Sequence, residues 1–217
     1  MYNLVIKDIK LGIHPTFFVM PFLTGALMLI PGWIYFLVLL YFCWITIPNT
    51  FGGFKAQNDL LFTAMMPVTK KDMVKARVSV IVILELLHIV IAMLFGILNL
   101  NLYPHFVYHF FAPHMAFWGL CFVMLAIFNL VLFPMYYKTA YKYGGAVSTA
   151  IAAAMLFAGI AQWIGVENSA VADAFNGAGA HNTALQISIL AAGIAIFIVF
   201  TMIAYRMAVK RFLKVEI

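Results

Sequence analysis

Glu85 and His88 are the ionisable side chains set deepest within an apolar stretch of the sequence. Residues three positions apart share one face of a helix. A charge at the middle of a membrane costs roughly 2.5–3.5 kcal/mol, so such groups usually face protein or water. The pair could form a proton relay or contact a substrate. Equally, Glu85 could hydrogen-bond His88 or a neighbouring helix and only set the packing, so we regard the pair as a translocation or packing site.

Three histidines form a second group in an aromatic stretch, and the first two, His105 and His109, have the spacing of metal ligands on one face of a helix. Pro104 and Pro113 favour an irregular loop instead, and aromatic residues are typical of a membrane interface. We expect no metal ion at His105, His109 or His114. An integral membrane metalloenzyme that uses these histidines or the pair above stays an alternative.

The sequence lacks the motifs of the common phosphate, metal and nucleophile sites. Gly52-Gly53-Phe-Lys55 has neither the spacing nor the hydroxyl residue of a phosphate loop. No H-E-x-x-H, paired-cysteine or G-x-S-x-G pattern occurs, and Cys43 and Cys121 lie in apolar runs. We predict that the chain is not an enzyme and has no nucleotide-binding domain, cofactor or metal of its own.

The composition indicates whether the chain folds in water or in a lipid membrane. Of its 217 residues, 66% are hydrophobic and only 9% are charged, and the mean hydropathy is +1.05. A water-soluble core could not hide so much apolar surface, which predicts an all-α, multi-pass protein of the cell membrane, bacterial plasma membrane by preference. The net charge of +6 is spread between apolar runs rather than gathered on one face, so we expect no nucleic acid as a partner.

The apolar runs predict six transmembrane helices in a single domain, residues 1–217. Pro31-Gly32 divides the first long run in two, Pro15 and Pro21 bend the first helix, and Pro134 ends the fourth. With this division all 13 Lys and Arg residues fall on one side, which places both termini in the cytosol. Asn129 and Gln162 are expected to hydrogen-bond between helices. The predicted spans are about 11–30, 33–50, 78–98, 114–135, 146–164 and 186–207.

The first 14 residues alternate apolar and charged positions in a pattern that fits a short amphipathic helix at the cytosolic interface. A frayed terminus is the alternative. The apolar and basic positions occupy opposite faces of that helix: Leu4, Ile6, Ile9 and Ile13 against Lys7 and Lys10.

Residues 57–77 form the longest polar interruption in the chain. Thr69 and Asp72 have the spacing of a helix cap, with Pro67 blocking helix before them. Upstream, Asn58 or Asp59 could cap a shorter helix from Leu60 to Met66. Apolar residues beside exposed charges then favour a surface that docks a protein partner. The alternative is an ordinary interfacial loop with lysines that snorkel to water.

This layout, with its long loop after the second span, resembles ABC-2-type permeases, the transmembrane subunits of ABC exporters, and above all the small half-size class of Gram-positive bacteria. The likeness in sequence covers about twenty residues: Asn58-Asp59-Leu60-Leu61-Phe62, Met66-Pro67-Val68-Thr69-Lys70 and Met73-Val74-Lys75-Ala76-Arg77. The chain departs mildly from the family pattern, with Met66 in place of Leu and Lys70 in place of Arg. Exporters of phenol-soluble modulins, bacitracin and lantibiotics have subunits of this kind.

The resemblance implies a transport subunit that docks two copies of an ABC ATPase and a second permease, identical or homologous, in the lipid membrane. ATP and magnesium would bind the ATPase, and amphipathic or antimicrobial and cytolytic peptides would be the substrates. A membrane-embedded regulatory or assembly protein that docks a cytosolic partner is the alternative. The coupling helix that docks the ATPase would comprise Asn58, Asp59, Leu60, Leu61, Phe62, Met65, Met66 and Pro67. The cytosolic structural residues would be Thr69, Lys70, Lys71 and Asp72.

Overall fold

The computed structural model describes residues 2–139, 142–177 and 180–215, and within these ranges it contains helices and turns but no strand. The predicted all-α class is therefore confirmed. In chain order the elements are α1 (Tyr2–Gly12), α2 (Thr16–Gly25), the 3-10 helix η1 (Ala26–Leu29), α3 (Phe36–Tyr41), the π-helical stretch η2 (Phe42–Thr46), α4 (Ile47–Ala56), α5 (Asp59–Ala64), α6 (Lys70–Leu102), α7 (Met115–Thr139), α8 (Tyr143–Glu167), α9 (Ser169–Asn176) and α10 (Ala180–Phe212).

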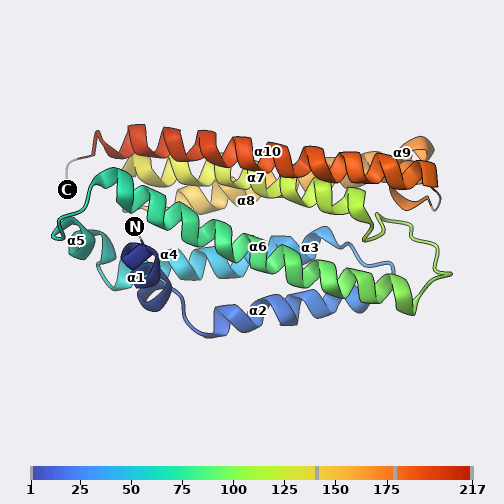
Figure 1. Ribbon diagram of the computed structural model, residues 1–217, viewed down its shortest axis with the longest axis horizontal. Helices are drawn as coiled ribbons and strands as arrows, with labels where there is room; N and C mark the ends of the chain where they lie inside the picture. The colour runs from blue at the N-terminus through green and yellow to red at the C-terminus, as the bar shows by residue number, and fades with distance from the viewer. Residues whose placement is uncertain (1, 140–141, 178–179, 216–217) are drawn as a thin grey trace.

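The long helices lie side by side in an elongated bundle, and the chain runs back and forth along it (Figure 1). Both ends of the chain lie at the same end of the bundle, together with α1 and α5. The loop between α6 and α7 and the short helix α9 lie at the opposite end. The bundle therefore has one end built from α1, α5 and the termini, and one built from connecting loops.

Five helical segments of the described chain are long and apolar enough to cross a membrane: Phe36–Ala56, Lys70–Leu102, Met115–Thr139, Tyr143–Glu167 and Asn182–Phe212. Each overlaps one of the last five predicted spans and extends beyond it. The helices α6 and α10 have 33 residues each, about 50 Å at the usual rise. Because the hydrocarbon core is only about 30 Å thick, several turns of both helices extend past it.

The first predicted span, 11–30, corresponds in the structure to a shorter apolar helix. The only apolar helix there runs from Thr16 to Leu29, as ten α-helical residues and a four-residue 3-10 segment, about 23 Å in all. The helix predicted within the first 14 residues is α1, which ends at Gly12. The chain breaks before Pro15 because a proline disfavours helix at the residue before it. Pro21 lies inside α2, as expected.

Two other prolines lie inside helices. Pro134 does not end the fourth span, because α7 continues to Thr139. Pro48 lies in the first turn of α4, directly after the π-helical stretch of η2. A proline deprives the preceding turn of one backbone donor, and π stretches are among the usual ways a helix accommodates such a defect. The prolines modify these helices without interrupting them.

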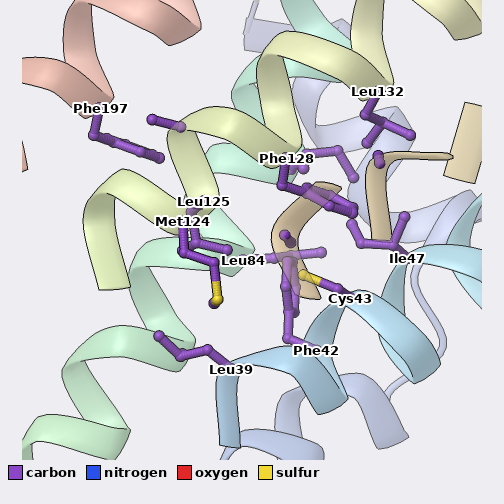
Figure 2. Close-up of a cluster of buried hydrophobic side chains, with 14 of the residues drawn as sticks. Leu39, Phe42, Cys43, Ile47, Leu84, Met124, Leu125, Phe128, Leu132 and Phe197 are labelled. Carbon is purple, nitrogen blue, oxygen red and sulfur yellow. The ribbon is translucent and has the colours of Figure 1, made fainter. Parts of the chain in front are cut away.

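A hydrophobic core holds the bundle together along its centre. Figure 2 shows part of it, where side chains of α3, η2, α4, α6, α7 and α10 converge. The labelled members are Leu39, Phe42, Cys43, Ile47, Leu84, Met124, Leu125, Phe128, Leu132 and Phe197.

The closest helix pair is α7 with α10, whose backbones meet at two glycines. A Cβ atom built on Gly119 would lie 2.6 Å from the carbonyl oxygen of Ile189, and one built on Gly193 would lie 2.7 Å from the Cα of Gly119. Real Cβ contacts are essentially never this short. Small residues let membrane helices approach closely, and these two make the contact between α7 and α10 a contact of backbones.

Candidate functional site

The predicted helix cap at Thr69 is present at the start of α6. The Thr69 hydroxyl accepts a hydrogen bond from the backbone N–H of Asp72 at 3.1 Å and donates one to the Asp72 carboxylate at 2.6 Å. Thr69 has extended backbone angles, as an N-cap residue should. Lys70 lies over the Phe212 ring and donates a hydrogen bond to the carbonyl of Val215 at 2.6 Å. Lys71 is exposed.

The predicted short helix upstream is α5, which runs from Asp59 to Ala64 rather than from Leu60 to Met66. Asn58 occupies its N-cap position in the left-handed region, at φ 47°, and its side chain makes no capping hydrogen bond. Asparagine tolerates this conformation better than most residues. Asn58 therefore turns the chain out of α4 and into α5 through its backbone, not by capping the helix.

Asp59, the first residue of α5, is buried and bound by two basic residues. Its Oδ1 accepts a hydrogen bond from Lys7 Nζ in α1 at 2.5 Å. Its Oδ2 accepts one from Arg77 Nη2 in α6. Lys7 Nζ also donates to the hydroxyl of Thr63, one turn further along α5, at 2.5 Å. A single carboxylate thus connects three helices.

Asp8 completes what we call the charge cluster: Lys7, Asp8, Asp59 and Arg77. Arg77 Nε donates to Asp8 Oδ2 at 2.9 Å, and Lys7 Nζ lies 3.0 Å from Asp8 Oδ1. The guanidinium of Arg77 also lies over the Phe54 ring of α4, 3.3 Å from its centroid. The four formal charges balance, which is the condition under which buried charges are tolerated.

The electrostatics of Asp59 follow from these contacts. Burial alone would raise the pKa of this carboxyl group, but the positive charge of Arg77 and the hydrogen bond from Lys7 hold the pKa below its ordinary value. Asp59 is therefore ionised at neutral pH. Removing one partner of such a buried pair usually costs about 3–5 kcal/mol, because the other charge is left uncompensated.

The inward direction of Lys7 corrects the expectation that the lysines of α1 share an outward face. Only Lys10 is exposed, whereas the Lys7 side chain is 13% exposed. The buried face of α1 holds Leu4, Asp8 and Gly12, which are spaced by four residues. Gly12 lies against the Phe54 ring, where no Cβ atom would fit. The four-residue spacing of these positions is the sequence pattern from which the inward orientation of Asp8 could have been predicted.

A cavity of about 170 Å³ adjoins the charge cluster. Its walls come from α1, α4, α5, α6, α7 and α10, and include Tyr136, Tyr137 and Phe212 besides the four charged residues. Its volume is large enough for several water molecules. The charge cluster therefore lies where six helices meet at this end of the bundle.

The opposite face of α5 is apolar and exposed. Leu61, Phe62 and Met65, which we call the docking face, are 44%, 55% and 84% exposed. Of the other residues proposed for docking, Asn58 and Pro67 are exposed and Leu60 and Met66 are half-buried. Asp59 is the exception, since only 4% of it is exposed. Its side chain fixes α5 from within the protein.

Glu85 and His88 are both buried but do not hydrogen-bond each other. Glu85 Oε2 accepts a hydrogen bond from Asn129 Nδ2 of α7 at 2.9 Å, which confirms the interhelical bond expected of Asn129. Of the two hydrogen-bond partners left open for Glu85, the structure has the neighbouring helix. His88 Nδ1 lies 3.2 Å from the carbonyl of Leu84 in its own helix. The relay arrangement of Glu85 with His88 is therefore not formed.

The histidines of the 103–114 segment lie in an irregular loop, as the two prolines indicate. His109 is exposed and packs edge-on against Phe110. Among the described residues there is no group of three or more His, Cys, Asp and Glu side chains placed to hold a metal ion. The loop is held instead by Asn176 of α9, which accepts from the Ala112 N–H and donates to the Phe110 carbonyl.

The comparison with known families covers nearly the whole chain. A family model described as "ABC-2 family transporter protein" matches residues 3–212. No curated protein and no solved structure matches the chain. The match therefore includes α1, α5, the charge cluster and all five candidate membrane spans.

Proposed function

The chain belongs to the ABC-2 family of transporter proteins and is a multi-pass membrane permease, and from this premise we propose that it is the transmembrane subunit of an exporter for amphipathic peptides. Permeases of this family generally pair with ATPase subunits. In the proposed complex two ATPase copies drive two permease subunits, identical or homologous, and ATP and magnesium bind the ATPase alone. Antimicrobial or cytolytic peptides are the substrate class.

The observation that carries the proposal is the construction of α5. A helix of six residues would not hold its place alone, yet the charge cluster fixes α5 against α1 and α6 from one side. The other side presents the docking face, where three large apolar side chains are exposed close to one another in the sequence. A rigid, exposed apolar helix is suited to a groove in a partner protein.

The placement of the basic residues supports cytosolic termini and six passages through the bundle, with α2 and η1 as a short first passage. The Lys and Arg residues belong to α1, α4, the start of α6, the segment around the end of α7, and the end of α10. These parts lie at the end of the bundle that carries α5 (Figure 1). Basic residues stay on the cytoplasmic side, so the docking face would meet a cytosolic ATPase.

A groove between α3 and α8 supports an amphipathic substrate. It has a volume of about 370 Å³ and is lined almost entirely by apolar and aromatic side chains, among them Trp44, Phe110 and Trp163. Gln162 is the one amide in its lining, and its Nε2 atom is buried without a hydrogen-bond partner. An apolar wall with one unpaired hydrogen-bond donor is suited to a peptide substrate that is largely hydrophobic and carries carbonyl groups.

The test is co-purification with an ABC ATPase from the products of the neighbouring genes. Leu61→Glu and Met65→Glu each place a charge in the docking face, and both should release the ATPase. Val107→Glu is the matched control, because Val107 is 88% exposed in the loop at the opposite end of the bundle. ATPase that stays bound to both docking variants would contradict the proposed interface.

A second measurement separates transport from docking alone. Candidate amphipathic peptides should stimulate ATP hydrolysis by the purified complex, and the stimulation should be lost with Leu61→Glu. A complex that forms but moves no peptide into inverted vesicles would instead fit a regulatory or assembly protein.

A further inference from the structure

Glu85 lies at the centre of a buried polar cluster that the docking function does not use. None of its surface is exposed, and the same holds for Asn129 of α7. Asn129 Nδ2 donates to Glu85 Oε2 at 2.9 Å and lies 3.4 Å from the hydroxyl of Thr201 in α10. The cluster therefore joins the three helices α6, α7 and α10 inside the membrane-spanning part of the bundle.

The cluster has more hydrogen-bond acceptors than donors. Glu85 Oε1, Asn129 Oδ1 and His88 Nε2 are all buried without a partner. A carbonyl oxygen only accepts, so the contact of His88 Nδ1 with the Leu84 carbonyl places the ring hydrogen on Nδ1 and leaves Nε2 an acceptor. Three unpaired acceptors in one buried cluster are costly unless something supplies a hydrogen.

No charge near Glu85 could balance a carboxylate. The titratable groups that face it from the packed elements are His88 on α6 and the buried thiol of Cys43 on η2, whereas α7 and α10 contribute the neutral Asn129 and Thr201. Figure 2 shows the apolar surroundings, with Leu84 and Phe128, the sequence neighbours of Glu85 and Asn129, in one cluster with Cys43. The His88 ring packs on Phe42 at a centroid distance of 4.6 Å, and none of the ion pairs among the described residues involves His88 or Glu85.

We propose that Glu85 is a proton-binding site, and that it holds a proton in the conformation described here. A buried carboxylate without a cation is strongly disfavoured relative to the neutral acid. The proton supplies the missing donor, and the neutral acid still accepts from Asn129. If the Asn129 amide is turned over, its oxygen faces the carboxyl group and the proton is required there as well. Opening the bundle to water would release the proton, so protonation favours the packed state of α6, α7 and α10.

Infrared spectroscopy of the full-length protein in nanodiscs tests the proposal. The wild type should show the carbonyl stretch of a protonated carboxylic acid at neutral pH, and Glu85→Gln should remove it. Glu167→Gln is the matched control, because Glu167 is an exposed carboxyl at the end of α8 and its removal should leave the band in place. A wild-type spectrum without this band, or with a band that survives in Glu85→Gln, overturns the proposal.

Thermal unfolding against pH gives a second readout. When a carboxyl group binds its proton more tightly in the folded protein than in the unfolded chain, the folded state loses stability as the pH rises. The midpoint of the wild type should therefore fall relative to that of Glu85→Gln as the pH is raised, with Glu167→Gln following the wild type. A constant difference between wild type and Glu85→Gln at every pH, or a Glu85→Gln protein that does not fold, counts against a neutral Glu85.

Asn129→Leu provides an independent variant. It removes the hydrogen bond to Glu85 Oε2 while leaving the carboxyl group in place. The acid band should then move to the position of a carboxyl group with fewer hydrogen bonds. An unchanged band would show that the protonated acid is another residue.

Discussion

Lys7 of α1 donates a hydrogen bond of 2.5 Å to Asp59 of α5, although the two residues are 52 positions apart in the chain. Lys7 thereby couples the N-terminal helix to the short helix that carries the docking face. Because Asp59 also binds Arg77 near the start of α6, a push on α5 would reach α1 and α6 through the same carboxylate. Under the proposed docking, the charge cluster joins the ATPase contact to the membrane helices.

Lys7→Ala should loosen this joint. The variant leaves the two buried carboxylates of Asp8 and Asp59 with Arg77 as their only cationic partner in the cluster, so one negative charge is uncompensated and the expected loss is about 3–5 kcal/mol. Thermal unfolding of the purified permease measures the loss, and ATPase stimulation by peptide should fall more than ATPase binding does. Lys10→Ala on the exposed face of α1 is the matched control and should change neither. Equal stability of the two variants would contradict the joint.

The pH dependence of stability should reveal Asp59. Its pKa is lower in the folded protein than in the unfolded chain, so the stabilisation it supplies is present above the unfolded pKa and is lost as the pH falls through the folded one. The wild type should therefore unfold at a higher temperature than Asp59→Asn at neutral pH. The two midpoints should converge as the pH falls below about 4.

Convergence in acid distinguishes this effect from a simple loss of packing. A packing defect in Asp59→Asn would keep the two midpoints apart at every pH. Asp72→Asn is a useful comparison, since Asp72 takes part in the α6 cap and not in the charge cluster.

Local signals predicted the start of α6 and the presence of α5. Thr69, Asp72 and Pro67 lie within six residues, and the cap depends only on them. The last five membrane helices were predictable for a similar reason. Each is a separate apolar run, and its hydropathy is calculated from its own residues alone. The first is shorter than predicted, because hydropathy counts apolar length, whereas the chain breaks before Pro15 and leaves Thr16–Leu29 as the apolar helix.

The contacts between distant residues could not be predicted in this way. Asp59 was assigned to the outer surface of the docking helix, because its burial depends on Lys7 and Arg77 lying on two other helices. The partner of Glu85 was left open between His88 and another helix for the same reason, and it proved to be Asn129. Periodicity shows which face of a helix is apolar, but it does not show which helices meet.

Thr69→Ala should weaken the first turn of α6. The variant loses the side-chain acceptor of the Asp72 N–H, which usually costs about 1 kcal/mol. Hydrogen exchange should accelerate at the backbone amides of residues 70–72, while the rest of α6 stays protected. Thr69→Ser retains the hydroxyl and should behave like the wild type. Uniform acceleration along α6 would show that Thr69 acts through something other than the cap.

Gly193→Ala should destabilise the contact between α7 and α10. The added methyl group would meet the backbone of Gly119, with the Cα at 2.7 Å, and a backbone cannot move aside as a side chain can. Overpacking of this kind costs about 1–3 kcal/mol. Gly159→Ala in α8 is the matched control, because nothing lies within 4 Å of its added Cβ. There the better helix propensity of alanine should stabilise the protein by about 0.5–1 kcal/mol. The two substitutions should therefore shift the unfolding midpoint in opposite directions, and a rise with Gly193→Ala would mean that the two helices do not touch at these glycines.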